Sequence, residues 1–194
     1  MTTTPTLLWL RRDLRLGDHP ALDAARARGG PVIPLFILDD AADLEGGAAA
    51  RWRLSRSLEA LARALEGIGG RLILRRGPSA SVLDQVIGET GAGAVIWSRR
   101  YEPEARARDA EIKADLRGRG FDADSRAGML LREPHEVRAK TGGFYKVYTP
   151  YSRASMAMAD PGEPLPAPER WPAPARWPRS ETLAALGLET GAAR

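Results

Sequence analysis

Four short apolar runs divide the first half of the chain, and each has the length and composition of a buried strand. They are rich in Leu, Ile and Val, which is typical of strands covered on both faces. The runs lie at residues 7–10, 32–38, 72–74 and 94–97. A fifth strand is expected at 121–124, after the last strong helical pattern. The pattern therefore predicts a five-stranded sheet.

Between these strands the hydrophobic period becomes helical. Residues 50–66 show it most clearly, because leucines recur along one helix face at Leu54, Leu58, Leu61 and Leu65. An earlier helix begins at Pro20, where His19 stands at the cap position, and runs to about Arg28. Further helices are predicted at 79–90 and 103–116, and a loop at 40–47. In the helix at 103–116 we expect ion pairs Glu104–Arg108 and Asp109–Lys113.

Strands separated by helices of this length indicate βαβ units with right-handed crossovers. The predicted fold is α/β: a doubly wound, mostly parallel five-stranded sheet of order 3-2-1-4-5 with helices on both faces. Residues 1–130 would form this α/β domain. A segment at 131–155 would complete it, and residues 156–194 would follow as a linker.

The last segment has a different composition. Seven of the 15 prolines lie between Pro161 and Pro178, which excludes a helix or central strand and predicts an extended connector. Trp171 and Trp177 within it are expected to pack as a strap, either on this domain or on a partner. A short helix is expected at 181–188. A long linker before so little structure suggests that a larger protein has been cut here.

The amino-acid composition excludes several kinds of functional site. The 194 residues carry a net charge of +4, which permits phosphate or nucleic-acid binding without arguing for it. Cysteine is absent and there are two histidines, which excludes disulfides, thiolate metal sites, cysteine nucleophiles and multi-histidine metal sites. The sequence shows neither an apolar run of membrane-spanning length nor a secretory signal. We therefore expect a soluble protein of the reducing cytoplasm.

The sequence offers binding residues but no catalytic constellation. It lacks the G-x-G-x-x-G fingerprint after the first strand, a Walker A loop and a G-x-S-x-G elbow. In doubly wound sheets, ligands bind beyond the carboxyl ends of the strands, where the strand order reverses. That crevice is flanked here by Arg11–Arg15 and Ser98–Glu102, whose arginines can hold an anion and whose Tyr101 can stack on a flat ring. Equally, Asp13 can pair with a neighbouring arginine to lock the turn, and Tyr101 and Glu102 can be structural.

Three ordered blocks carry a family resemblance. They are L-W-L-R-R-D-L-R-L-G-D-H-P-A-L at 8–22, R-Y-E-P-E-A-R-A-R-D at 100–109 and G-G-F-Y-K-V-Y-T-P-Y-S-R-A at 142–154. Together they resemble signatures of the DNA photolyase/cryptochrome family over about residues 7–155. The resemblance implies a Rossmann-like N-terminal domain, followed in the family by a connector and a helical domain. That helical domain binds FAD and the flipped pyrimidine dimer of damaged DNA, and this chain stops before it.

The resemblance also implies a role for the α/β domain, which holds a light-harvesting antenna chromophore in the family. The residues expected to bind it are Arg11, Asp39, Arg51, Tyr101, Glu102 and Glu104; Asp39 and Arg51 are chosen because they flank the loop after the second strand. Folate-binding members use an Asn-Glu pair that matches Glu104 and Ala105 here. Because Ala105 replaces the Glu, an 8-hydroxy-deazaflavin or FMN is favoured over methenyltetrahydrofolate.

The leading hypothesis is therefore an antenna domain of a photolyase-like protein. Joined to the FAD domain, it would serve blue-light repair of pyrimidine dimers, a carbon–carbon lyase reaction. The chain alone is expected to be inactive. The alternatives are a stand-alone α/β nucleotide-binding module, a fragment of a cryptochrome-type blue-light receptor, and a nucleic-acid-binding module that uses its arginines.

Overall fold

The computed structural model describes residues 4–39, 47–139 and 142–188. Its centre is a parallel five-stranded sheet of order β3-β2-β1-β4-β5, as predicted. The strands are β1 (Thr6–Leu10), β2 (Val32–Leu38), β3 (Ile73–Arg76), β4 (Ala94–Ser98) and β5 (Asp122–Arg126). Because all five are parallel, their carboxyl ends share one edge of the sheet, and the loops that follow them gather there.

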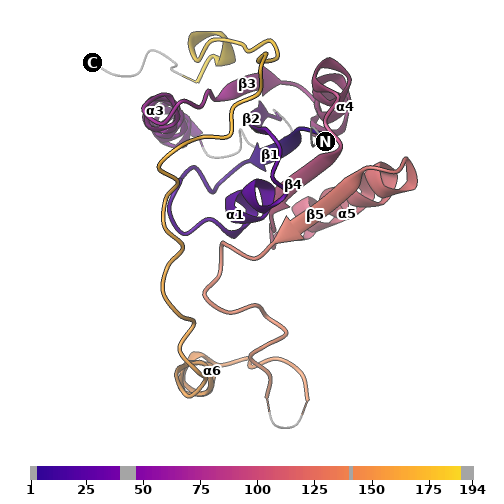
Figure 1. The fold of residues 1–194 in the computed structure, drawn as a ribbon. Coiled ribbons are helices and arrows are strands. Elements are labelled where there is room, and N and C mark those ends of the chain that lie inside the picture. The colour runs from indigo at the N-terminus through magenta and orange to yellow at the C-terminus, as the bar shows by residue number, and fades with distance from the viewer. Residues whose placement is uncertain (1–3, 40–46, 140–141, 189–194) are drawn as a thin grey trace.

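Helices cover both faces of the sheet (Figure 1). They are α1 (Pro20–Ala27), α3 (Gly47–Glu66), α4 (Ser79–Thr90) and α5 (Pro103–Gly118). Helices α1 and α3 pack on one face, and α4 and α5 on the other. This arrangement confirms the doubly wound prediction.

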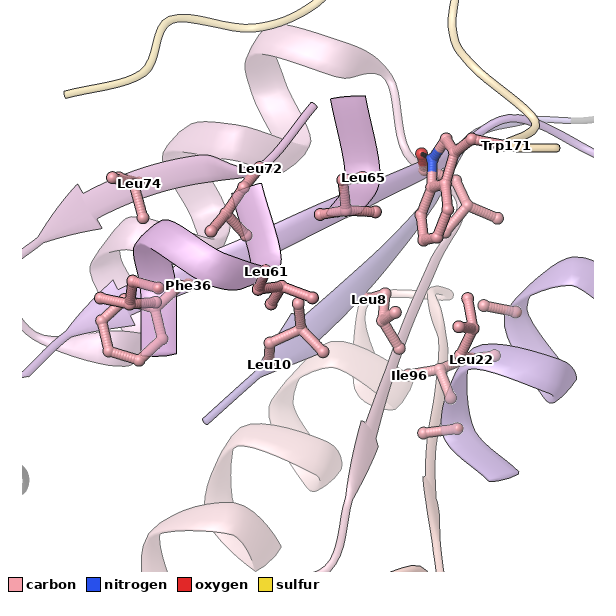
Figure 2. Packing of buried hydrophobic residues seen from close by; sticks show 14 of the residues in the cluster. Leu8, Leu10, Leu22, Phe36, Leu61, Leu65, Leu72, Leu74, Ile96 and Trp171 are labelled. Carbon is pink, nitrogen blue, oxygen red and sulfur yellow. Dashed lines mark hydrogen bonds between the residues drawn. The ribbon is translucent and has the colours of Figure 1, made fainter. Parts of the chain in front are cut away.

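Each face of the sheet has its own apolar core, because successive side chains of a strand point to opposite sides. In β1, Leu8 and Leu10 face α1 and α3, whereas Leu7 and Trp9 face α4 and α5. Figure 2 shows the first core, where Leu61 and Leu65 of α3 lie over the sheet. The predicted leucine stripe is thus buried, except that Leu54 is half-buried.

Some predicted boundaries were displaced. The third strand is Ile73–Arg76 rather than 72–74, and the fifth is Asp122–Arg126 rather than 121–124. Pairing explains both shifts, since β3 ends opposite Leu38 and β5 opposite Ser98. Helix α3 begins at Gly47, which had been assigned to the preceding loop; the rest of that loop, residues 40–46, lies outside the described residues.

The proline-rich connector packs on this domain as a strap, along the side of α1, α3 and β3 (Figure 1). Trp171 is 7% exposed, and its indole Nε1 donates a hydrogen bond to the Val32 carbonyl at 2.8 Å. A Cβ atom on Gly70 would lie 2.9 Å from the Trp171 ring, so glycine is needed there. At the strap's end, the helix predicted at 181–188 is only a 3-10 turn, η1 (Ala184–Leu186).

One helix was not predicted. Helix α6 (Tyr148–Met156) buries none of its residues and stands away from the sheet at the end of a long excursion (Figure 1). The sequence had placed residues 131–155 as the end of the domain without a helix. Within the described ranges, no helix is long and apolar enough to cross a bilayer.

Candidate functional site

The loop after β1 is held by a buried Asp–His pair. The Asp13 carboxylate accepts a hydrogen bond from the Arg11 backbone N–H at 2.8 Å and lies 3.2 Å from His19 Nε2. His19 Nδ1 accepts from the Leu22 N–H at 3.1 Å, which caps α1 and leaves the ring proton on Nε2, facing Asp13. Both side chains are almost fully buried. Asp13 therefore holds the turn by pairing with His19. The sequence analysis had considered a neighbouring arginine side chain as its partner.

Asp13 has a strongly perturbed pKa. Burial alone would raise the pKa of this carboxyl, but the hydrogen bonds it accepts, above all that from His19, hold the pKa well below its ordinary value. Arg15 contributes separately to the loop, because its guanidinium donates to the carbonyls of Asp18 and Gly128, at 2.7 Å each from Nη2. The loop is thus tied to the segment after β5.

Arg11 occupies the crevice between β1 and β4. One Nη donates to both carboxylate oxygens of Asp109 in α5, at 2.7 and 2.8 Å, and the other donates to the Ser98 carbonyl at the end of β4. Its carbon Cζ also lies 4.3 Å from the centre of the Trp9 ring. Arg11 therefore lies where predicted, but its guanidinium joins β1, β4 and α5. The sequence had assigned Asp109 to Lys113, and that pair is wrong because Asp109 turns inward.

Glu102 and Tyr101 lie on one side of this crevice. The Glu102 carboxylate accepts from Arg12 at 2.6 Å and from Arg100 at 2.9 Å. The hydrogen bond from Arg100 lowers the pKa of Glu102 to about 2. The Tyr101 hydroxyl donates to Glu133 at 2.5 Å, and burial together with that carboxylate raises the pKa of Tyr101.

Asp39 and Arg108 lie on the other side. The Asp39 carboxylate accepts from the backbone N–H and the hydroxyl of Ser79, at 3.0 and 2.7 Å, and so holds the start of α4. Arg108 of α5 approaches Asp39 at 3.9 Å and Asp109 at 3.6 Å. Arg108 therefore contacts the carboxylates of Asp39 and Asp109 instead of forming the predicted pair with Glu104.

Two further predicted residues have different surroundings. Arg51 is half-buried in the first turns of α3, and its Nε is buried without a hydrogen-bond partner in the described part of the chain. The Arg108 Nε is in the same state. Glu104 is exposed in the first turn of α5, and Ala105 beside it is buried. The structure thus separates the six predicted residues into distinct surroundings instead of one pocket.

Two hollows lie beside the crevice that the Arg11 side chain fills. One, of about 320 Å³, lies between α4 and α5 and includes Asp39, Ser79, Arg108 and Arg119 in its lining. The other, of about 640 Å³, is lined by residues of α5, β5 and the segment after it, with Tyr101, Arg106, Lys113, Glu133 and Phe144 among them. Sequence reasoning missed Arg108 and Glu133. The spacing of Arg108 on α5 pointed to a solvent-exposed pair, and Glu133 lies in a segment without a pattern.

Comparisons with known proteins agree with this architecture. The family model described as DNA photolyase matches residues 6–169. A deoxyribodipyrimidine photo-lyase of Agrobacterium fabrum is 45% identical over 177 residues, which cover 88% of this chain and 37% of that protein. The crystal structure of a class III photolyase from Agrobacterium tumefaciens matches with a TM-score of 0.94 and 44% identity, over 99% of this chain and 40% of that one.

A third match extends only to the fold. It is the structure of an archaeal photolyase from Sulfolobus tokodaii with two FAD molecules, which implies a novel light-harvesting cofactor. Its TM-score is 0.78 at 21% identity, over 96% of this chain and 42% of that one. This chain therefore spans about two fifths of the length of these three relatives, and corresponds to the N-terminal α/β domain of photolyases. On the family model and these matches, the chain belongs to the DNA photolyase family.

Proposed function

We propose that this chain is the light-harvesting part of a photolyase of the cytoplasm. It would hold an antenna chromophore and pass excitation to FAD bound by a helical domain. The observation that carries the proposal is the match of almost the whole chain to the α/β part of longer photolyases, at 44% identity. Such a role requires a rigid ring-binding site and no general acid or base, which agrees with the binding residues at the carboxyl edge of the sheet.

The arginines at this edge suit the anionic tail of such a chromophore. The buried Nε atoms of Arg51 and Arg108 have no hydrogen-bond partner among the described residues, and a buried donor without an acceptor is costly. A phosphate or carboxylate is the acceptor that guanidinium groups bind best. We assign the direct contacts to Arg108 and Asp39, which line the hollow between α4 and α5, and propose that Arg51 reaches the tail from the first turns of α3 when the chromophore binds. Arg11 and Glu102 position the loops around them.

The ring system is expected to be a deazaflavin or FMN. A folate would rely on the first turn of α5, where Ala105 is buried and has no side-chain acceptor. Glu104 in the same turn is exposed and could contact a ring only from outside. A chromophore held mainly through its tail by Arg51 and Arg108 does not depend on this turn.

The partner would be the FAD-binding domain, which in turn would engage damaged DNA. Helix α6 and the segment before it present exposed apolar side chains, namely Leu130, Leu131, Val147, Tyr148 and Met156. A contiguous apolar surface of this kind marks an interaction site. We propose that the helical domain packs on this surface in a full-length protein.

The test is absorbance and fluorescence titration of the purified chain with FMN, 8-hydroxy-deazaflavin and methenyltetrahydrofolate. We expect the two flavin-type ligands to bind more tightly than the folate. Arg108→Gln and Arg51→Gln should each weaken flavin binding about tenfold, the equivalent of ~1.4 kcal/mol. Arg63→Gln, an exposed arginine on α3, is the matched control and should leave it unchanged.

Three results would contradict parts of the proposal. Tightest binding of the folate would refute the argument from Ala105. Unchanged affinity in both arginine variants would place the chromophore elsewhere. Failure of all three ligands to bind would refute light harvesting by this chain and leave the nucleotide-binding module as the better hypothesis.

A further inference from the structure

The larger hollow, on the outer side of α5, is separate from the site assigned above to the antenna. Its floor is formed by Arg106, Ala110 and Lys113, which lie on one face of α5. Ser125 of β5 lies beside Lys113, and Tyr101 and Phe144 contribute aromatic rings. A volume of about 640 Å³ suits a small organic ligand.

Positive charge in this hollow exceeds negative charge. Its two carboxylates are already engaged, since Asp109 binds Arg11 and Glu133 accepts from Tyr101 and Arg99. Arg100 is likewise paired, with Glu102 at 2.9 Å. The cations left over are Arg106 and Lys113.

Arg106 and Lys113 are both placed to receive an anion. Arg106 is exposed, and its guanidinium makes no hydrogen bond or ion pair within the described ranges. Lys113 donates to the Ser125 hydroxyl at 2.6 Å, and Arg99 donates to the Ser125 carbonyl at 3.2 Å, so two cationic groups meet at one residue. The nearest carboxylate to Lys113 is Asp124, at 4.0 Å, and Asp124 is itself paired with Arg126 at 2.9 Å.

The electrostatics of Lys113 support this view. Burial is the main cause that lowers the pKa of Lys113; the charge of Asp124 opposes this shift, and the nearby charges of Arg117 and Arg99 add to it. Its ammonium also lies 5.4 Å from the centre of the Trp97 ring. An anion bound beside Ser125 would relieve this crowding of like charges.

An exposed aromatic ring completes the hollow. Phe144 is 61% exposed, which is costly for so large an apolar side chain. One face of this ring is covered by Arg138, at 5.0 Å from the ring centre, and the ring also lines the hollow. Tyr101 lines the hollow as well, with its hydroxyl fixed by Glu133.

We propose that this hollow binds a small ligand that joins an aromatic base to a phosphate, of the mononucleotide class. Arg106 and Lys113 would hold the phosphate beside Ser125, and the base would lie against Phe144. The same base-and-phosphate chemistry occurs in a nucleic-acid strand. A free mononucleotide is favoured because its terminal phosphate carries two charges, matching the two unbalanced cations.

The test is calorimetric titration of the whole chain with adenosine monophosphate at low ionic strength. Lys113→Gln and Arg106→Gln should each weaken binding about tenfold, and Phe144→Ala about fivefold or more, as expected for a lost charge contact and a lost stacking contact. Arg63→Gln is the matched control, because this exposed arginine lies on α3.

Titrations with related compounds identify which parts of the ligand the hollow recognises. Adenosine without its phosphate, and inorganic phosphate without the base, should each bind more weakly than adenosine monophosphate. Tighter binding of a short oligothymidylate, lost in the same variants, would overturn the proposal in favour of a nucleic-acid strand. No binding of adenosine monophosphate, or equal binding in all variants, would also overturn it. None of these results depends on whether a chromophore binds at Arg51 and Arg108.

Discussion

Arg11 and Asp109 form a buried ion pair at the meeting point of β1, β4 and α5. Their side chains are 5% and 12% exposed, and one Nη of Arg11 donates to both carboxylate oxygens of Asp109. Removing one partner of such a pair leaves a buried charge without compensation. The pair therefore acts as a brace for the carboxyl edge of the sheet, on which both candidate sites depend.

We predict that Asp109→Asn lowers the free energy of unfolding by about 3–5 kcal/mol, because Arg11 stays buried and loses its counter-charge. The comparison is Glu59→Gln, which removes the partner of Arg56 in an exposed pair on α3 and should cost far less, about 1 kcal/mol or less. Urea denaturation of both variants measures the difference. Equal losses would show that burial does not distinguish the two ion pairs.

Asp13 makes the stability of the fold depend on pH. Its pKa is depressed in the folded state, so its contribution is complete at neutral pH and is lost as the pH falls below the ordinary aspartate value of about 3.9. We predict that Asp13→Asn costs about 1–3 kcal/mol at neutral pH, and that the difference from the unaltered chain shrinks below about pH 4. Denaturation across pH tests this. The control is Asp23→Asn, an exposed position in α1; a pH-independent cost at Asp13 would contradict the prediction.

At the scale of elements, both free edges of the sheet are covered. On β3, Leu74 accepts from the Glu181 N–H and donates to the Ser180 hydroxyl, so the strap takes the place of a further strand. On β5, the backbones of Asp122 and Arg126 form hydrogen bonds on the side of β4: the Asp122 N–H donates to the Gly93 carbonyl, and the Arg126 carbonyl accepts from the Arg99 N–H. The carbonyls between them therefore face outward, and they accept from Arg117 and Arg99. Covered edges of this kind prevent pairing between sheets of different molecules.

The strap prediction concerns Trp171. Replacing Trp171 with Ala removes a buried indole and its hydrogen bond to Val32, and should cost about 3–5 kcal/mol. It should also loosen the strap around Arg170, whose side chain is already exposed, and so speed cleavage there by trypsin, which limited proteolysis would detect. Trp52→Ala is the control, because Trp52 is 52% exposed and should change stability little. Unchanged cleavage in Trp171→Ala would mean that the strap is held without this anchor.

The elements were predictable to the extent that local periodicity decides them. Continuous apolar runs and the leucine stripe predicted the strands and the helices between them, because those residues bury their faces within this chain. The strand order followed from the doubly wound fold that alternating strands and helices indicate. Helix α6 was missed because it buries nothing here and carries Pro150 in its first turn, so no apolar stripe marked it. Contacts at the carboxyl edge, such as Arg108 with Asp39, join residues far apart in sequence and leave no periodic signal.

At the scale of the whole molecule, the surface around α6 differs from the surface of the α/β core. The packed α/β core and the strap close the sheet on all sides, whereas α6 and residues 129–131 expose large apolar side chains. A surface of this type is stable in water only at a cost. That asymmetry agrees with the proposed helical partner.

The last prediction follows from the proposed helical partner. The chain alone should show no light-dependent repair of thymine dimers, because electron donation in the proposed mechanism needs a reduced flavin held by the helical domain. Free FAD should not restore repair, since loose flavin is neither oriented toward a dimer nor shielded from water. The measurement is dimer content after blue light, with the chain, with the chain and FAD, and with a full-length photolyase as positive control. Repair by the chain above the no-protein control would show that this α/β domain holds a reactive flavin and a dimer by itself, and would overturn its assignment as an antenna.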